Sequence, residues 1–396
     1  MTANAPARPS RRPRWVGVGQ SADTGSRRAG AEATAAAVDG REDTRLLVVF
    51  ASAAHDLEEL LAGVDPGEVP LIGCSTAGEI GMGGAADASV VIMALGGEGF
   101  AVSTSAATGA SARLREAGAE VAGCAEDVAG RPHRALLLLT DGLAGDQQDI
   151  VRGAYDVVGS AIPLVGGCAG DDLAMTATYQ LHGREVLRDA VVAAAIGSDA
   201  PLGIGVRHGW RRVGEPVLVT HSADNHVLAL DDVPALDVYL DRLDAPEAAR
   251  TDPAAFTRFA LTHPLGLARR SGEDHVRFVG GADFERRSLA CIAEVPQGGI
   301  AWFMEGDAAS VLHATEAACG DALDPLGGDA PLGLLAFDCI ARRGVLGSEG
   351  LAQEMDRIGR ASGGVPVAGF YTYGEIARTR GVSGFHNQTL VVLSLG

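Results

Sequence analysis

The stretch VPLIGCSTAGEI, from Val69 to Ile80, runs from a short apolar segment into a turn with two glycines and a carboxylate. Near the end of the chain, VPVAGFYTYGEI, from Val365 to Ile376, repeats the Pro, both Gly and the Glu at identical spacing. A third version, IPLVGGCAGDD at 162–172, is one residue shorter and has two Asp in place of the Glu. One structural unit therefore recurs along the chain, and the repeat decides the fold class.

Each of these turns belongs to a longer plan of strand, helix, second strand, glycine turn and later strand. The three copies begin at LLVVF (46–50), ALLLL (135–139) and LGLLAFDC (332–339), and they end near ASVVIMAL, AVVAAAIG and QTLVVLSL. Alternation of buried strands with helices predicts an α/β fold. We expect two related α/β halves with mixed sheets, built from repeated strand-helix-strand-GxxxxGE units.

The segment between the second and third copies has a different pattern of apolar and polar residues. Two alternating strands, 217–221 and 226–230, flank the turn SADN and predict a hairpin that leads into an amphipathic helix. We place the domain boundary here. The expected organisation is a disordered basic tail at 1–14, an N-terminal domain at 15–230 and a C-terminal domain at 231–396.

Composition excludes several classes of function. The net charge is −19, and only 5% of the residues are aromatic, so the sequence does not favour binding to nucleic acid. All 32 basic residues are Arg, which excludes Schiff-base lysine chemistry and an ordinary P-loop.

The cysteines and the apolar runs indicate a cytoplasmic protein. Six cysteines are spread along 396 residues without a CxxC pair, which is typical of reduced, buried thiols and suggests no metal cluster. The longest apolar runs, such as SVVIMAL, fall far short of the roughly 20 residues that span a bilayer, so no membrane insertion is expected.

The glycine turns are the candidate binding site. In a parallel sheet the carboxyl ends of the strands meet at one edge, where backbone N–H groups of the turns hold an anion and carboxylates hold a cation. Such a pocket suits an amino-acid-like zwitterion. The alternative is that the glycines only punctuate strand ends and the acids cap nearby turns. The candidate ligand-binding residues are Gly73, Cys74, Thr76, Gly78, Glu79, Cys168, Asp171, Gly369, Tyr371, Tyr373, Gly374 and Glu375.

The chain resembles the FIST family in the combination and order of six segments. These are LIGCSTAGEI, LVGGCAGDD, GWRRVGEPVLVTHSADNHVLALDDVPALDVYL, HPLGL, GFYTYGEIA and FHNQTLVVLSL. The resemblance runs from Trp15 to Gly396 and implies tandem N- and C-terminal FIST domains. It implies a sensory module for a small ligand, and it adds Asn387 to the candidate site. The chain ends after the last strand, so we expect a stand-alone sensor that signals to a separate partner such as a histidine kinase.

Two alternatives stay open. Some FIST-like proteins resemble haem-based nitric oxide sensors, so haem is a second ligand class, although no cofactor is expected in the main interpretation. A thiol-dependent enzyme would use Cys74 or Cys168 in a glycine turn as nucleophile, with His208 or His386 as base. The pattern names no convincing catalytic set and no metal ligands, so we expect a binding protein rather than an enzyme.

Overall fold

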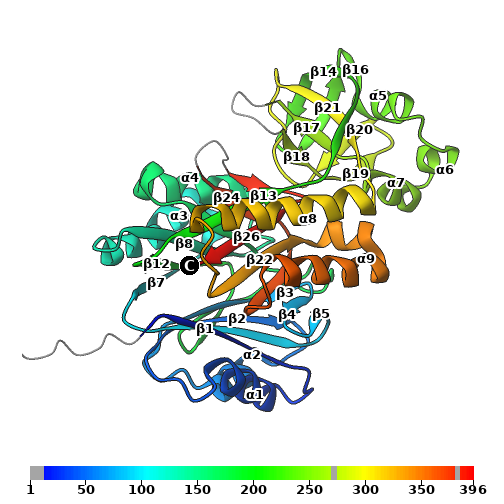
Figure 1. Ribbon diagram of the computed structural model, residues 1–396. Helices are drawn as coiled ribbons and strands as arrows, with labels where there is room; N and C mark the ends of the chain where they lie inside the picture. Colours follow the sequence, from blue (N-terminus) through cyan, green and yellow to red (C-terminus); the bar gives the residue numbers. More distant parts are fainter. Residues whose placement is uncertain (1–12, 269–273, 380–383) are drawn as a thin grey trace, which may run out of the picture.

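The computed structural model describes residues 13–268, 274–379 and 384–396. Its body consists of three α/β units, each with helices on the outer face of a sheet, and a further region of strands and helices projects from one side (Figure 1). The predicted α/β class with mixed sheets is confirmed.

The three units have the same order of elements. The first contains β1 (Trp15–Ser21), α1 (Ser26–Val38), β2 (Thr44–Ser52), α2 (Leu57–Val64), β3 (Leu71–Thr76), β4 (Glu79–Gly81), β5 (Gly84–Ala86) and β6 (Val90–Gly96). The second contains β7 (Phe100–Thr108), α3 (Leu114–Ala122), β8 (His133–Thr140), α4 (Gln147–Val158), β9 (Leu164–Cys168), β10 (Gln180–His182), β11 (Glu185–Leu187) and β12 (Ala190–Ser198). The third contains β13 (Leu202–Arg207), α8 (Ala308–Leu323), β22 (Gly333–Cys339), α9 (Ile340–Ala361), β23 (Val367–Thr372), β24 (Glu375–Arg378), β25 (Phe385–His386) and β26 (Leu390–Leu395).

Sequence features at matching places explain why the units repeat. In each unit two neighbouring strands are parallel, as β2 with β3, β8 with β9 and β22 with β23, and their apolar runs are buried on both faces. Glycine lets the first helix of a unit lie directly on its first strand. A Cβ at Gly19 would stand 2.0 Å from the Ala33 carbonyl oxygen, and one at Gly205 would stand 1.9 Å from that of Ala318.

The units exchange short hairpins in a closed cycle. The hairpin β4–β5 of the first unit joins the sheet of the third, β10–β11 of the second joins that of the first, and β24–β25 of the third joins that of the second. Each hairpin begins directly after a glycine turn or its following loop. Every sheet of the three units is therefore completed by strands from another unit.

The projecting region is inserted between β13 and α8. It contains β14 (Arg211–Ala223), β15 (His226–Leu230), β16 (Val233–Pro234), α5 (Ala235–Arg242), α6 (Glu247–Thr251), α7 (Pro253–Ala260), β17 (Leu265–Leu267), β18 (His275–Arg277), β19 (Val279–Asp283), β20 (Ser288–Cys291) and β21 (Ile300–Glu305). The predicted hairpin is present as β14 and β15. The region has its own core, in which the Tyr239 ring lies 5.6 Å from that of Phe303.

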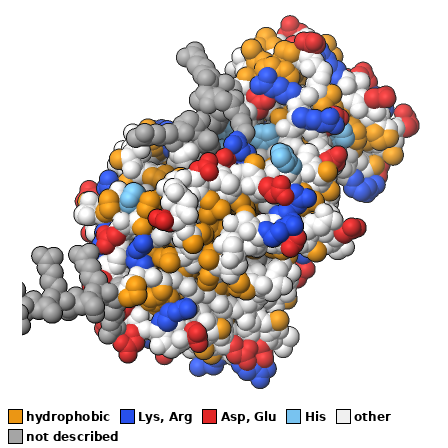
Figure 2. All heavy atoms as spheres, viewed as in Figure 1, with side chains coloured by type: hydrophobic (Ala, Val, Ile, Leu, Met, Phe, Trp, Pro, Cys, Tyr) orange, Lys and Arg blue, Asp and Glu red, His pale blue; other side chains and the backbone are white. Residues whose placement is uncertain are grey.

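The inner faces of the three sheets share a single core. Phe50 of the first unit contacts Phe370 of the third at 4.8 Å between ring centroids, and Leu137 of the second unit belongs to the same buried cluster. Figure 2 shows acidic and basic side chains interspersed over the viewed face, without one large basic patch. Within the described residues, no helix has the length and apolar character needed to cross a membrane.

Candidate functional site

The structure brings the three glycine turns together at the carboxyl ends of β3, β9 and β23. The first turn (73–79) bonds the third (369–375): Ala77 N–H donates to Tyr371 O (3.0 Å). The second turn (166–172) is bonded to both others. Its Cys168 N–H donates to the Gly374 carbonyl of the third turn (2.8 Å), and its Gly170 N–H donates to the Ser75 carbonyl of the first turn (3.0 Å). The turns thus close a ring, and these N–H groups are used within it rather than left for an anionic ligand.

The two glutamates of the turns act as buried braces. The Glu79 carboxylate accepts hydrogen bonds from the Thr76 hydroxyl and from the N–H (3.0 Å) and hydroxyl (2.7 Å) of Ser89. Glu375 makes the same three bonds with Thr372 and Thr389. Both side chains are fully buried, and burial raises the pKa of each carboxyl from 4.5 to about 7. Each glutamate ties its turn to the last strand of its unit.

Asp171 holds the loop that follows the second turn. Its carboxylate accepts from the N–H groups of Met175 (2.9 Å), Thr176 (2.7 Å) and Ala177 (2.9 Å), and from the Tyr373 hydroxyl of the third turn. The same Tyr373 oxygen accepts the Leu173 N–H at 2.8 Å. Asp171 and Tyr373 therefore fix this loop across a unit boundary.

The remaining predicted residues are also inside the protein. A Cβ at Gly73 or Gly369 would meet the carbonyl oxygen of the neighbouring strand at 2.4 or 1.9 Å, so both glycines permit close strand approach. Tyr371 and Asn387 are buried, and neither the Tyr371 hydroxyl nor Asn387 Oδ1 has a hydrogen-bond partner among the described residues. A ligand-binding role for these positions stays a prediction.

The thiols considered as nucleophiles are fully buried. Burial raises the pKa of Cys74 and of Cys168 well above the ordinary value of 9.0, so both are neutral thiols near pH 7. Cys168 Sγ accepts a hydrogen bond from the Thr140 hydroxyl at 3.1 Å. This environment favours packing over thiol-dependent catalysis.

An open cavity lies directly beside the ring of turns. It has a volume of about 670 Å³, within the roughly 300–1,000 Å³ typical of small-molecule sites. We call it the rim cavity. Its lining comes from the first unit, from the loop after the second turn and from α9: Ser52, Ala54, Ala77, Asp87, Ala88, Asp172, Leu173, Ile340, Arg343, Gly344, Gly347, Ser348 and Leu351.

Opposite charges line the rim cavity. Arg343 donates from both terminal nitrogens to Asp87, at 2.6 and 2.8 Å, and also to the Ala77 carbonyl at 3.2 Å. The hydrogen bonds to Asp87 raise the pKa of Arg343, so it stays charged. Asp172 receives a hydrogen bond from the Ser52 hydroxyl on Oδ2 (2.9 Å), while no bond to its Oδ1 is found within the described residues. The cavity therefore offers a guanidinium and a carboxylate to one ligand.

Some of the strained backbone positions lie in the same wall. Ala88, Asp172 and Leu173 have φ of 52°, 54° and 64°, values that cost energy for residues with a side chain. Gly347 interrupts α9 with φ 60° and ψ −175°. Strained positions of this kind persist where the surrounding contacts enforce them and are frequent at binding sites.

A buried ionic cluster fixes the start of α9 behind the cavity. Arg342 pairs with Asp338 of β22 and with Glu354 of α9, each at 2.6 Å, and all three side chains are fully buried. Burial, together with the charge of Glu354, raises the pKa of Asp338, while the positive charge of Arg342 opposes that shift. The adjacent residue, Arg343, is thereby positioned at the cavity.

The sequence interpretation missed Arg343, Asp87 and Ser52. Arg343 lies four residues after the end of β22. Ligands of parallel sheets bind at the carboxyl ends of the strands, and this rule, which selected the glycine turns, could also have selected Arg343. Its pairing with Asp87, 256 positions away, appears only in the folded chain. Asp172 was noted in the repeat but not chosen as a binding residue.

Comparisons with known proteins agree with this architecture. The model of the FIST N domain matches residues 45–233, and that of the FIST C domain matches residues 235–378. The chain belongs to the FIST family. FIST domains are sensory, ligand-binding domains of signal transduction. The boundary between the matched FIST domains lies at the short strand β16 of the inserted region.

A relative from Methanocaldococcus jannaschii, an uncharacterized protein MJ1623, is 27% identical to this FIST protein over 162 residues. The matched part is 38% of this chain and 31% of that protein. The chain thus spans about a third of the length of that relative. The relative is itself uncharacterized, so the match assigns no function to this chain.

Within the described residues, three cavities lack an axial ligand for a haem. Haem needs an axial nitrogen or sulfur ligand facing a wide pocket. Neither the rim cavity nor two others, of about 730 and 600 Å³, is lined by His or Cys. His208 is half-buried, accepts the Trp210 N–H on Nδ1 at 2.9 Å, and has a pKa lowered by burial to about 4. No cluster of three or more metal-ligating side chains occurs among the described residues.

Proposed function

We propose that this FIST protein binds a small amino-acid-like zwitterion in the rim cavity, without chemical turnover, and passes the signal to a separate partner. The observation that carries the proposal is the joint presence of Arg343 and Asp172 in one cavity of suitable volume. In the bound state, the ligand carboxylate accepts hydrogen bonds from Arg343, and the ligand ammonium donates to Oδ1 of Asp172.

The lining also indicates what the ligand side chain meets. Leu173, Ile340 and Leu351 contribute apolar surface to the cavity, and Leu173 is 60% exposed at its rim. A bound apolar side chain would cover part of this surface, which is favourable by about 25 cal/mol per Å² of apolar area removed from water. Amino acids with apolar side chains are therefore the expected ligands.

Ligand entry must compete with the ion pair of Arg343 and Asp87. The Asp87 side chain is 66% exposed, so replacing it at the guanidinium costs little, because exposed ion pairs contribute about 0–1 kcal/mol. Binding at this point would alter contacts between α9 and the loop that carries Asp87. A partner such as a histidine kinase would read that change at the surface.

A thermal-shift screen of the protein amino acids tests the proposal. A ligand that binds only the native state raises its stability, by about 2.7 kcal/mol at a hundredfold excess over Kd. We expect at least one apolar amino acid to raise the Tm of the wild type, and the Arg343→Gln and Asp172→Asn variants to lose that increase. Arg360→Gln is the matched control, because Arg360 is an exposed, ion-paired residue further along α9.

Two results would count against the proposal. One is a screen in which no amino acid raises the Tm of the wild type. The other is an increase in the Tm of the two cavity variants that equals the increase of the wild type. The haem alternative has its own readout, the absorption spectrum of protein purified from cells supplied with iron and a haem precursor. We expect no stoichiometric Soret band, and such a band would replace the zwitterion with haem.

A further inference from the structure

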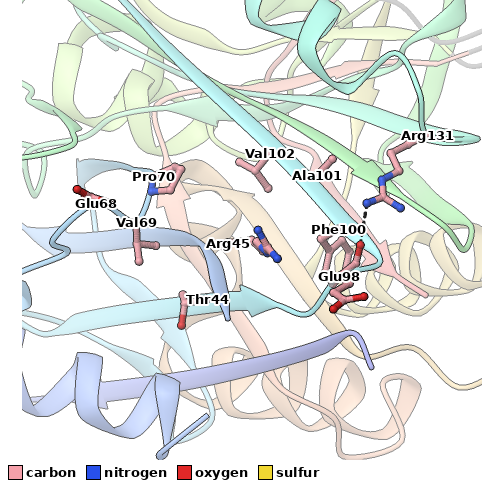
Figure 3. Close-up of a pocket in the computed structure, with 10 residues that line it drawn as sticks. All are labelled: Thr44, Arg45, Glu68, Val69, Pro70, Glu98, Phe100, Ala101, Val102 and Arg131. Carbon is pink, nitrogen blue, oxygen red and sulfur yellow. Dashed lines mark hydrogen bonds between the residues drawn. The ribbon is translucent and has the colours of Figure 1, made fainter. Parts of the chain in front are cut away.

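A second cavity lies at the opposite end of the strands that carry the rim cavity. It has a volume of about 730 Å³ and is lined by residues at the amino ends of β2 and β3 and by the start of β7 (Figure 3). Strand β2 runs from Arg45 in this cavity to Ser52 in the rim cavity. The two sites are therefore separate, and we call this one the Arg45 cavity.

A β-bulge places Arg45 in the cavity. Along the antiparallel pair of β2 and β6, Thr44 lies opposite Gly96 and Leu46 lies opposite Leu95, so Arg45 is the extra residue. A bulge of this kind interrupts the regular alternation of a strand and changes the direction of a side chain. Figure 3 shows the Arg45 side chain in the middle of the lining residues, between Val69 and Phe100.

The Arg45 guanidinium is available to a ligand. It makes no hydrogen bond or ion pair with any residue of 13–268, 274–379 or 384–396, and the residue is exposed. The other arginine of the cavity is held in place, because Arg131 bonds Asp199 at 2.6 Å and the Glu98 carbonyl at 2.7 Å. The N–H groups of the Arg45 guanidinium are therefore available as hydrogen-bond donors to a ligand.

The wall beside Arg45 is apolar. It is formed by Val69, Pro70, Phe100, Ala101 and Val102, and the Phe100 side chain is anchored in the common core at 2% exposure. Arg14 packs over the Phe100 ring, 5.6 Å from its centroid. The buried Phe100 supports the wall, and the half-buried Val69, Pro70, Ala101 and Val102 can cover the apolar body of a ligand while the charged end reaches Arg45.

We propose that the Arg45 cavity binds a small organic monocarboxylate with an apolar body. A guanidinium matches the two oxygens of a carboxylate through paired hydrogen bonds. Arg131 is already paired with Asp199, so Arg45 is the available cation, and Glu68 and Glu98 also line the cavity. A doubly charged phosphate would be repelled by these glutamates, whereas a single negative charge at Arg45 is accommodated.

Binding of benzoate, followed by the chemical shifts of backbone amides in ¹⁵N-labelled full-length protein, tests this site. We expect saturable shifts at Leu46, Val69 and Val102, and a roughly tenfold or greater loss of affinity in Arg45→Gln, because a charge-assisted pair of hydrogen bonds is removed. Arg184→Gln is the matched control. Arg184 is an exposed arginine of the third cavity, 3.1 Å from Asp65, and its loss should leave benzoate binding unchanged.

A second variant, Val102→Asp, tests the wall independently of Arg45 by placing a carboxylate against the ligand. It should lose benzoate binding while keeping the native spectrum, since Val102 is half-buried near the sheet edge. Unchanged affinity in Arg45→Gln would overturn the proposal, and so would inorganic phosphate binding as tightly as benzoate. The expected shifts lie at amides in or beside the Arg45 cavity, so this result does not depend on the rim cavity.

Discussion

At the residue scale, Glu79 and Glu375 show how a repeated motif acquires a structural role. Each carboxylate accepts two hydroxyl hydrogen bonds and one backbone N–H bond inside its own unit. Their charge is therefore directed into the protein, toward the last strand of the unit. The charges that a ligand would meet belong to residues near the turns, the half-buried Arg343 and the exposed Asp172.

The raised pKa of these glutamates predicts a pH dependence of stability. Each carboxyl has an ordinary pKa of 4.5 and a folded pKa of about 7, so between these values the native state keeps a proton that the unfolded state has released. The free energy of unfolding should then fall as the pH rises from about 4.5 to 7, by up to about 1.4 kcal/mol per pH unit for each group.

Urea unfolding at pH 5, 6 and 7 measures this slope. We expect Glu375→Gln to reduce it, because the amide keeps the shape and an acceptor but does not titrate. Glu349→Gln, at an exposed position of α9, serves as the control and should leave the slope as in the wild type. An unchanged slope in Glu375→Gln would contradict the proposed linkage.

At the element scale, α9 shows both the reach of the sequence interpretation and its limit. In the third copy of the repeat, the helix of the plan is expected at EGLAQEMDRIGRAS, 349–362, and this segment matches the second part of α9. The plan did not predict the part from Ile340 to Leu346, because Gly344 and Gly347 weaken the local helix signal. Tertiary ion pairs of Arg342 hold that part in place, and no window of sequence contains them.

The interruption of α9 at Gly347 should require a glycine at this position. Its φ of 60° disfavours any residue with a side chain, although a Cβ would meet nothing within 4 Å. Gly347→Ala should destabilise the protein by about 1–2 kcal/mol through backbone strain and weaken binding in the rim cavity. Chemical denaturation and ligand titration of the variant measure the two effects.

Gly359 provides the matched control within the same helix. It has helical geometry, and a Cβ there also meets nothing within 4 Å. Gly359→Ala should therefore stabilise the protein by about 0.5–1 kcal/mol, since alanine favours a helix interior. If both variants behaved alike, the interruption at Gly347 would not be a fixed feature of the site.

At the scale of the whole molecule, the exchange of hairpins could not be predicted. The sequence shows three units with the predicted order of strand, helix, second strand, glycine turn and later strand, but the short hairpin between the turn and the later strand was not predicted. A strand as short as β4 or β10 carries too few alternating residues to specify which sheet it joins. That choice depends on the shared core, where Phe50, Leu137 and Phe370 come from three different units.

The exchange predicts that the three units unfold together. Each sheet loses a strand if the neighbouring unit opens, so no unit is complete alone. Native-state hydrogen exchange should give β3, β9 and β23 the same opening free energy in increasing denaturant. The inserted region, with its own core, is free to open separately. Opening of one unit at a distinctly lower free energy would show that the hairpins do not couple them.

The most direct test of the central claim is a crystal structure of the protein with the amino acid that raises its Tm most. The account predicts density in the rim cavity, with the ligand carboxylate within hydrogen-bond distance of Arg343 and its ammonium within that distance of Asp172. A ligand bound elsewhere, with the Arg343–Asp87 pair intact and the rim cavity filled only by water, would contradict it.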